Sequence, residues 1–235
     1  MRVLFLKGGF GNNLFQVAQT EPGDIINGYF LKKNWLGSML GWSYHSTRQI
    51  EQLFPVVYQR PTFFQFILLS IIFIIRRAGG GIEQISFLGQ QVLFGYFQDN
   101  LSKKGIHYVK SFFPPVESGS GIAMHYRGGD FLLIERGLTA EYYGEALRII
   151  DAELSEIFVL TSSADDYFSN VNIQGCNLFQ GTPMEDFDVI RASSRVICSN
   201  STFCLWACLV SEKSLVILPK EYEIYAEFFS STEII

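Results

Sequence analysis

The chain has 235 residues, of which 48% are hydrophobic and 17% are charged. This composition is sufficient for a packed core, in one large domain or two small ones, and it argues against a disordered chain. The net charge of −5 argues against a general nucleic-acid-binding surface, so an anionic ligand has to be held in a local pocket.

The chain begins with a strand-like apolar segment, Val3 to Leu6, and continues with GGFGNNLFQ from Gly8 to Gln16. We expect a glycine-rich loop here, which lets the backbone approach a ligand closely, and then a short helix that ends before Pro22. The spacing fits neither the dinucleotide fingerprint, because Asn13 stands where Gly or Ala is needed, nor a Walker loop. The first residues do not form a signal peptide, which predicts a cytoplasmic protein.

A strongly apolar segment, TFFQFILLSIIFIIRR, runs from Thr62 to Arg77, with Arg60 ahead of it. Its apolar part is shorter than the roughly 20 residues that a spanning helix needs. A buried helix or pair of strands fits this length. A helix that lies on the membrane surface through Phe63–Arg77, flanked by arginines, is the main alternative, and a membrane span is the third.

The four cysteines are Cys176, Cys198, Cys204 and Cys208. They form no CxxC pair, and no histidine lies near them in the sequence. This spacing argues against a zinc site and predicts buried, reduced thiols.

The two halves of the chain have different patterns. Residues up to about 118 show no regular pattern, and FFPPVESGSG, from Phe112 to Gly121, is typical of a linker. We therefore predict an N-terminal domain over residues 1–118 and a C-terminal domain over residues 119–235.

The second half alternates between strand and helix patterns, which predicts a parallel sheet with helices on both faces and ligands at the carboxyl ends of the strands. The predicted strands are Ile122–Arg127, Ile157–Thr161, Cys176–Phe179, Arg195–Ser199 and Leu215–Leu218. The predicted helices are Ala140–Leu154, Met184–Ser193, Phe203–Val210 and Glu221–Phe229.

The first candidate site is HYRGGDF, which ends the strand that begins at Ile122. Strand side chains alternate, so His125 and Arg127 point to one face. Arg127 is well placed to bind an anion with two hydrogen bonds. The alternative is a structural ion pair with a nearby aspartate. Asp130 follows in the loop, where it either serves as a base or caps the loop.

Two further candidates lie at predicted helix starts. Ser201 and Thr202 precede the apolar helix that begins near Phe203. They either cap that helix or surround a phosphate at its N-terminus. Asp186 and Asp188 begin another helix, where they either favour the helix dipole or accept hydrogen bonds from a base such as guanine.

Five segments, in the same order, resemble motifs of the α1,2-fucosyltransferases, glycosyltransferase family 11. GGFGNNLFQVA resembles Gly-x-Gly-Asn-Gln-x-Phe-Gln, and GYFQD is similar to Gly-Tyr-Trp-Gln. HYRGGDF resembles His-x-Arg-Arg-x-Asp, FVLTSSADDYF resembles a strand end with Phe-Ser-Asp-Asp, and EDFDVIRASSRVICSNSTFCLWACLV resembles the long C-terminal motif. The resemblance covers most of the chain except roughly residues 20–90.

The resemblance implies an α/β fold of the GT-B-like class, with two facing Rossmann-like domains, and an inverting, metal-independent enzyme that uses GDP-fucose and no other cofactor. It implies that the first domain, which is short, binds the acceptor and the second binds GDP-sugar. The catalytic residues implied are Arg127, Asn12 and Asp130. The donor-binding residues implied are Gly11, Asn12, His125, Arg127, Asp186, Ser201, Thr202 and Phe203, with His125 and Asp186 at the guanine and the others at the phosphates or across the cleft.

The chain also departs from the family pattern. Gly128 replaces the second arginine of the signature, Asn13 replaces a glutamine and Phe97 replaces a tryptophan. We expect transfer of L-fucose to a galactose-type hydroxyl, with an α1,2 linkage, on an oligosaccharide of a surface polysaccharide such as an O-antigen. A lipid-linked acceptor would suit a peripheral place at the inner membrane face. The alternatives are a degenerate nucleotide- or glycan-binding protein without turnover and a transferase that uses another GDP-sugar.

Overall fold

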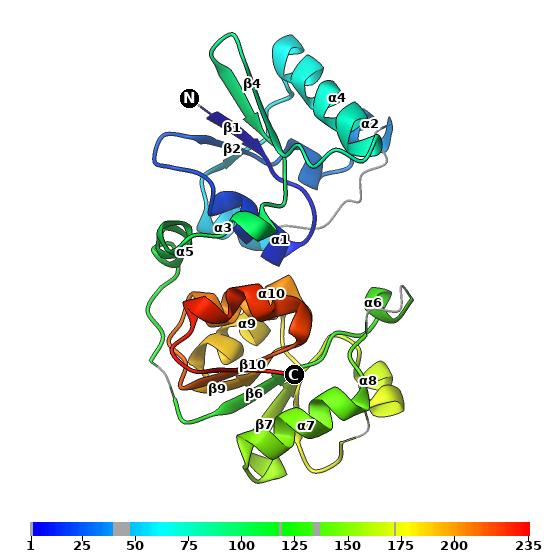
Figure 1. Cartoon of the computed structure of the whole chain (residues 1–235), viewed down its shortest axis with the longest axis vertical. Coiled ribbons are helices and arrows are strands. Elements are labelled where there is room, and N and C mark those ends of the chain that lie inside the picture. The colour runs from blue at the N-terminus through cyan, green and yellow to red at the C-terminus, as the bar shows by residue number, and fades with distance from the viewer. Residues whose placement is uncertain (1, 40–47, 118, 134–136, 172) are drawn as a thin grey trace. The chain divides into compact units, whose positions relative to one another are not determined.

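The computed structural model describes residues 2–39, 48–117, 119–133, 137–171 and 173–235. They form two compact units, Met1–Phe113 (unit 1) and Pro114–Ile235 (unit 2). The division falls inside the Pro-rich segment that is typical of a linker. Each unit is built around its own sheet, with helices on the faces of that sheet (Figure 1).

Unit 2 contains a six-stranded sheet in the order β11-β10-β9-β6-β7-β8, and every neighbouring pair is parallel. With the strands numbered 1 to 6 in chain order, this is the 3-2-1-4-5-6 order of a Rossmann fold. The strand order reverses between β6 and β9, which are the first and fourth strands of the unit. The strands are β6 (Ile122–His125), β7 (Ile157–Leu160), β8 (Asn177–Phe179), β9 (Arg195–Ile197), β10 (Leu215–Leu218) and β11 (Thr232–Ile234).

Helices cover this sheet on both faces, with α7 on one side and α9 and α10 on the other (Figure 1). Met124 and Tyr126 lie in the core under α7, together with Tyr143, Ala146 and Ile150. The helices are α6 (Asp130–Leu133), α7 (Ala140–Ile150), α8 (Ala164–Asn170), α9 (Pro183–Ala192) and α10 (Thr202–Leu209), with 3-10 segments η3 (Leu154–Glu156) and η4 (Lys220–Phe228).

Side-chain caps define the start of two of these helices. The Thr139 hydroxyl accepts a hydrogen bond from the Tyr142 amide at the start of α7. Thr182 and Glu185 form a capping box at the start of α9, with Pro183 in the first turn. These caps fix where the loops that follow the strands end.

The predicted elements of unit 2 agree with the structure in order, with three corrections. The helix predicted to reach Leu154 ends at Ile150, because Asp151 adopts a left-handed conformation with φ of +47°. The helix predicted over Glu221–Phe229 is the 3-10 segment η4. Four elements were not predicted at all: the helices α6 and α8, the 3-10 segment η3 and the final strand β11.

Unit 1 contains a five-stranded sheet in the order β3-β2-β1-β5-β4. All neighbouring pairs are parallel except β4 with β5, which form an antiparallel hairpin. The sequence of this half shows no regular pattern, but the structure has a regular sheet there. The strands are β1 (Arg2–Phe5), β2 (Ile25–Asn27), β3 (Val56–Val57), β4 (Gln84–Phe87) and β5 (Gln90–Leu93).

The helices of unit 1 are α1 (Phe10–Val17), α2 (Trp35–Met39), α3 (Arg48–Leu53), α4 (Phe63–Arg77) and α5 (Lys103–Lys110), with 3-10 segments η1 (Tyr29–Leu31) and η2 (Gln98–Asn100). Because α1 begins at Phe10, the stretch predicted as a glycine-rich loop is mostly the first turns of a helix. The connection from β1 to this helix is Leu6, Lys7, Gly8, with φ of +81°, and Gly9. Both units are α/β with mainly parallel sheets, so the predicted GT-B-like fold class with two Rossmann-like units is confirmed.

The apolar segment Thr62–Arg77 forms the helix α4, with Thr62 and Gln65 as its capping box. One face of α4 packs on the sheet through Leu68, Leu69 and Ile72. Among the residues that the structure describes, none lies in a helix that combines the length and the apolar character needed to cross a membrane.

Two buried side chains tie α1 to the carboxyl ends of β1 and β5. Gln16 accepts a hydrogen bond from the Lys7 amide (3.0 Å) and donates one to the Gly95 carbonyl (2.9 Å). Asn13 donates a hydrogen bond to the Lys7 carbonyl (2.8 Å). The polar residues of this motif therefore satisfy backbone groups at the ends of adjacent strands, as buried polar groups require.

We predict that Gln16→Ala destabilises unit 1 by about 2–4 kcal/mol, because the Gly95 carbonyl and the Lys7 amide both lose their partner. The free energy of unfolding from urea denaturation measures this. Gln19→Ala is the matched control, because Gln19 makes an exposed hydrogen bond to Asn100, and we expect about 0.5 kcal/mol or less. Equal losses in the two variants would contradict this role of Gln16.

Candidate functional site

The reversal of strand order in unit 2 brings together the ends of β6 and β9. His125 is the last residue of β6, and Ser199 follows β9. His125 Nδ1 lies 2.6 Å from Ser199 Oγ, and both side chains are buried. In open parallel sheets the crevice at such a reversal is where ligands bind. Sequence analysis placed Ser199 at the end of a predicted strand but did not include it among the donor-binding residues.

Burial and the nearby Arg127 guanidinium lower the pKa of His125 to about 3. The imidazole is therefore neutral at physiological pH, with one nitrogen engaged by Ser199. Its ring lies 5.8 Å from the ring of Phe203, which in turn lies 5.2 Å from the ring of Phe187. The end of β6, the start of α9 and the start of α10 thus meet around Phe203.

Arg127 follows β6 and is half-buried. Its Cζ lies 5.0 Å from the centre of the Phe131 ring, which holds the guanidinium beside the loop. Arg127 is close enough to His125 to lower its pKa, while Met124 and Tyr126 point into the core on the other face. The predicted alternation of side chains is confirmed.

The glycine that replaces the second arginine of the signature has a structural cause. A Cβ at position 128 would lie 2.8 Å from Asp166 Oδ2 and 3.0 Å from the Cβ of Ser163. Asp166 also accepts a hydrogen bond from the Gly129 amide (2.8 Å). The start of α8 therefore occupies the space beside Gly128, which leaves no room for a larger side chain.

Two other arginines of unit 2 were candidates to supply the missing charge, and both are engaged elsewhere. Arg191 is buried, and its Nη1 lies 2.7 Å from Asp188 Oδ1, while its Nη2 donates to the Pro114 carbonyl. Arg195 donates to the Ile150 carbonyl at 2.9 Å. Asp188 is thus explained by its ion pair with Arg191.

The helix α10 begins two residues after Asn200, with Ser201 as its N-cap residue. Ser201 is buried, but its hydroxyl makes no capping hydrogen bond. Thr202 and Phe203 form the first turn and are half-buried. The interpretation of Ser201 as a side-chain cap is therefore wrong. Phe203, in the first turn of α10, contacts the His125 ring, so the positive end of the helix dipole lies near His125.

Asp186 lies in the first turn of α9 and is half-buried. Burial, opposed in part by a hydrogen bond from the Gly181 backbone, raises its pKa to about 6. Its Oδ1 is buried and accepts no hydrogen bond from any residue that the structure describes. At neutral pH it is a carboxylate with an unused acceptor, next to the aromatic cluster of Phe187 and Phe203.

The remaining predicted site residues are Asp130, Gly11 and Asn12. The side chain of Asp130 falls outside the described residues, so its role as a base stays a prediction. Gly11 and Asn12 belong to α1 of unit 1, where Asn12 Oδ1 accepts a hydrogen bond from Gln98 Nε2 (3.3 Å). Their predicted place across a cleft from the donor also stays a prediction.

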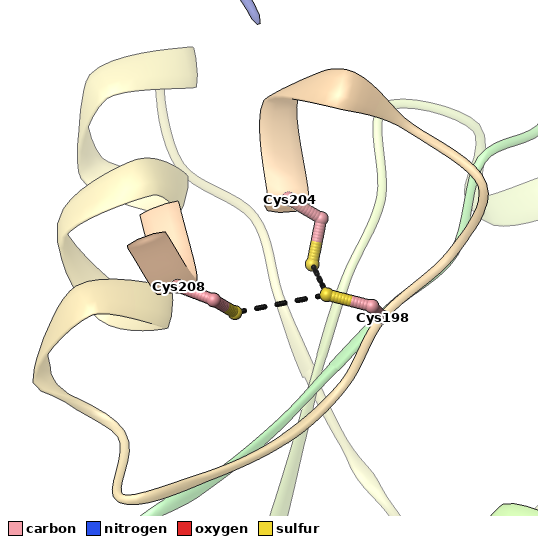
Figure 2. A group of neighbouring side chains, drawn as sticks. All are labelled: Cys198, Cys204 and Cys208. Atoms are coloured by element: carbon pink, nitrogen blue, oxygen red, sulfur yellow. Dashed lines mark hydrogen bonds between the residues drawn. The ribbon is translucent and has the colours of Figure 1, made fainter. Parts of the chain in front are cut away.

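Three of the four cysteines, Cys198, Cys204 and Cys208, are buried side by side (Figure 2). Cys198 Sγ lies 3.0 Å from Cys204 Sγ and 3.6 Å from Cys208 Sγ. Three thiols this close could hold a soft metal ion. The sequence spacing did not predict the cluster, because Cys198 follows a strand while Cys204 and Cys208 lie one turn apart on α10. The expectation of buried thiols is confirmed for these three, whereas Cys176 is only half-buried.

A scan against models of protein families finds no match, and a search of curated proteins finds none either. A search of solved structures finds similarity to the fucosyltransferase NodZ from Bradyrhizobium, at 13% identity and a TM-score of 0.48. It also finds NodZ α-1,6-fucosyltransferase soaked with GDP-fucose, at 13% identity and a TM-score of 0.44, and co-crystallised with GDP, at 14% identity and a TM-score of 0.47. Each comparison covers 89% of this chain and 92% of the other. Similarity at this level does not assign the chain to a family.

Proposed function

We propose that this protein is an inverting glycosyltransferase that moves L-fucose from GDP-fucose to a galactose-type hydroxyl of an oligosaccharide, with an α1,2 linkage. The observation that carries this proposal is the meeting of His125, Arg127 and the start of α10 at the strand reversal of unit 2. His125 and Ser199 lie 2.6 Å apart there. This is where a parallel sheet binds a nucleotide, and the order of the five sequence motifs supports a GDP-sugar as that nucleotide.

Asp186 supports guanine as the base. Guanine presents two adjacent N–H donors, which match the acceptors of one carboxylate. Asp186 has a buried Oδ1 that accepts no hydrogen bond within the described part of the chain, and burial raises the pKa of this carboxyl to about 6. A donor pair would offset the cost of burying the charge. The neutral imidazole of His125 would offer its second nitrogen on the other side of Phe203.

The chemistry requires stabilisation of the departing GDP. Negative charge grows on the phosphate as the sugar–phosphate bond breaks in an oxocarbenium-like transition state. In the proposed mechanism Arg127 and the amides of Thr202 and Phe203, with the Ser201 and Thr202 hydroxyls, stabilise this charge without a metal. The acceptor proton passes either to Asp130 or to the departing phosphate. Asn12 and Gly11 would contact the substrates from unit 1.

Gly128 favours a second candidate function. One cation fewer stands beside the phosphate than in the resembled family, because Asp166 and Ser163 occupy the space. A protein that binds a nucleotide or glycan without turnover would need less transition-state stabilisation. A transferase that uses another GDP-sugar would keep the same guanine site.

We predict that the protein releases GDP from GDP-fucose in the presence of galactosides, and that Arg127→Ala lowers this rate about 10²–10³-fold. Coupled detection of GDP measures the release, with GDP-mannose as the competing donor. Arg148→Ala is the matched control, because Arg148 is exposed and pairs with Glu145 on α7. Turnover that is unchanged in Arg127→Ala would contradict the mechanism. GDP binding without turnover would favour the binding protein, and faster release from GDP-mannose would favour the other donor.

We also propose that α4 lies on a membrane surface, where a lipid-linked acceptor would be reached. Four side chains form an apolar stripe at helical spacing on its outer face and are 77%, 39%, 37% and 64% exposed: Phe63, Ile67, Ile71 and Ile74. Phe64 stacks on Phe87 of the β4–β5 hairpin, with ring centres 5.9 Å apart, and Leu88 at the hairpin tip is 76% exposed. A contiguous exposed apolar patch of this kind marks an interaction surface.

The charges around this stripe favour an anionic bilayer as the partner. Arg60 and Arg77 are exposed at the two ends of α4, although the chain as a whole carries a net charge of −5. The one acidic residue between Arg60 and Gln91 is Glu83, and its carboxylate accepts hydrogen bonds from the Tyr96 and Phe97 amides. Local positive charge next to apolar side chains is typical of helices that bind anionic headgroups.

We predict that the protein cosediments with vesicles that contain anionic phosphatidylglycerol, and about tenfold less with neutral phosphatidylcholine vesicles. The double change Ile67→Ser and Ile74→Ser should lower binding at least about tenfold, because both side chains lose apolar contact with lipid. Ile224→Ser, at a 56% exposed position of unit 2, is the matched control. Equal binding to both vesicle types, or unchanged binding of the double variant, would contradict the surface assigned to α4.

A further inference from the structure

Unit 1 has its own reversal of strand order, between β1 and β5. β1 pairs with β2 on one side and β5 on the other, all parallel. Lys7 lies just beyond the carboxyl end of β1, and Tyr96 lies just beyond that of β5. The rule that places a ligand at the reversal in unit 2 therefore marks this edge of unit 1 as a second binding position.

Two cationic side chains converge at this edge. Lys7 Nζ lies 4.2 Å from the centre of the Phe94 ring and 4.3 Å from that of Tyr96. Arg76, in the last turn of α4, is close enough to both Lys7 and Tyr96 to affect their titration. Its Nη1 is buried and makes no hydrogen bond with any residue that the structure describes. The sequence held little signal for this pair, because Lys7 and Arg76 lie on separate elements.

Gly8 lets the backbone at this edge lie close to neighbouring side chains. Gly8 has φ of +81°, and a Cβ there would lie 3.1 Å from both Asn12 Nδ2 and the Tyr96 ring. Gly8 thus allows α1 to lie directly against Tyr96. The side-chain amide of Asn12, which accepts a hydrogen bond from Gln98, supplies a polar group beside Gly8.

The charge balance of this edge is unfavourable without an anion. Burial, and then the positive charge of Arg76, lower the pKa of Lys7 to about 7, while Glu83 acts in the opposite direction. The Glu83 carboxylate is already engaged by the Tyr96 and Phe97 amides. The charged and titratable groups that face Lys7 are thus Arg76 from α4, Glu83 ahead of β4 and Tyr96 after β5. Within the described ranges neither Lys7 nor Arg76 forms an ion pair with a carboxylate.

We propose that Lys7 and Arg76 bind an oxyanion, a phosphate or a carboxylate group, at the carboxyl end of β1. An unsatisfied guanidinium and an ammonium held between two rings are complementary to such a group, and arginine binds it through two hydrogen bonds. This anion site adds to the proposed function. It depends on that function only for the molecule from which the anion comes. The anion is either a phosphate group of a nucleotide donor or an acidic group of the acceptor.

The direct test follows the titration of Lys7 itself by NMR of protein labelled with ¹³C at lysine Cε. Inorganic pyrophosphate should raise the pKa of Lys7 by about one unit or more, because a bound anion favours the ammonium form. Its affinity at this position should therefore fall as the pH rises above 7. Arg76→Gln should raise the pKa of Lys7 in the free protein and weaken pyrophosphate binding at least about tenfold. Arg76→Lys keeps the charge but loses the two parallel hydrogen bonds, so it should weaken binding less than Arg76→Gln does.

Arg77→Gln is the matched control, because Arg77 is the next residue of α4 and is exposed. It should change neither the titration of Lys7 nor pyrophosphate binding. Glucuronate is the second probe, and a response to glucuronate alone assigns the position to an acidic acceptor, whereas a response to pyrophosphate and GDP assigns it to the donor. The inference is overturned if no anion moves the Lys7 titration, or if Arg77→Gln acts as strongly as Arg76→Gln. A Lys7 response in a protein without fucosyl transfer would overturn the proposed function alone.

Discussion

The hydrogen bond between His125 and Ser199 is the constraint on which the site of unit 2 depends. Parallel strands end at the same edge of a sheet, and the order reversal makes β6 and β9 neighbours although they are far apart in the sequence. The 2.6 Å contact joins the two strand ends, and burial keeps the pKa of the imidazole low, so the ring stays neutral. Arg127 follows the first strand and the start of α10 follows the second, so both are positioned by this one junction.

Both units have a reversal of strand order, where parallel sheets bind ligands, but the side chains at the two reversals differ. In unit 2 the edge carries one guanidinium, a helix N-terminus and the half-buried carboxylate of Asp186. In unit 1 it carries Lys7 and Arg76, and Asn13 and Gln16 make hydrogen bonds to the backbone there. A motif that looks like a ligand loop in the sequence is therefore in large part a structural junction, and the residues beside it carry the charge.

The order of elements in unit 2 could be predicted from the sequence because its strands are continuous apolar segments, such as Ile157–Leu160 and Leu215–Leu218, separated by helical patterns. The order in unit 1 could not, because β2 and β3 have only three and two residues and no detectable alternation. The helix α1 begins within a glycine- and asparagine-rich stretch, where tertiary hydrogen bonds of Gln16 outweigh poor helix propensity. His125, Arg127 and Asp186 could be selected from motifs and strand ends. Three other features could not be predicted, because they depend on contacts between elements far apart in the sequence. They are the role of Ser199, the Lys7–Arg76 pair and the lack of space for a side chain at Gly128 beside Asp166.

The central claim is that the edge at His125 and Asp186 binds a guanine nucleotide. Isothermal titration calorimetry with GDP and UDP tests it most directly. The account predicts that GDP binds at least about tenfold more tightly than UDP, because the Asp186 acceptors match the two N–H donors of guanine, and that Asp186→Ala removes this preference. Binding of UDP as tight as or tighter than that of GDP, or a preference for GDP that survives in Asp186→Ala, would contradict it.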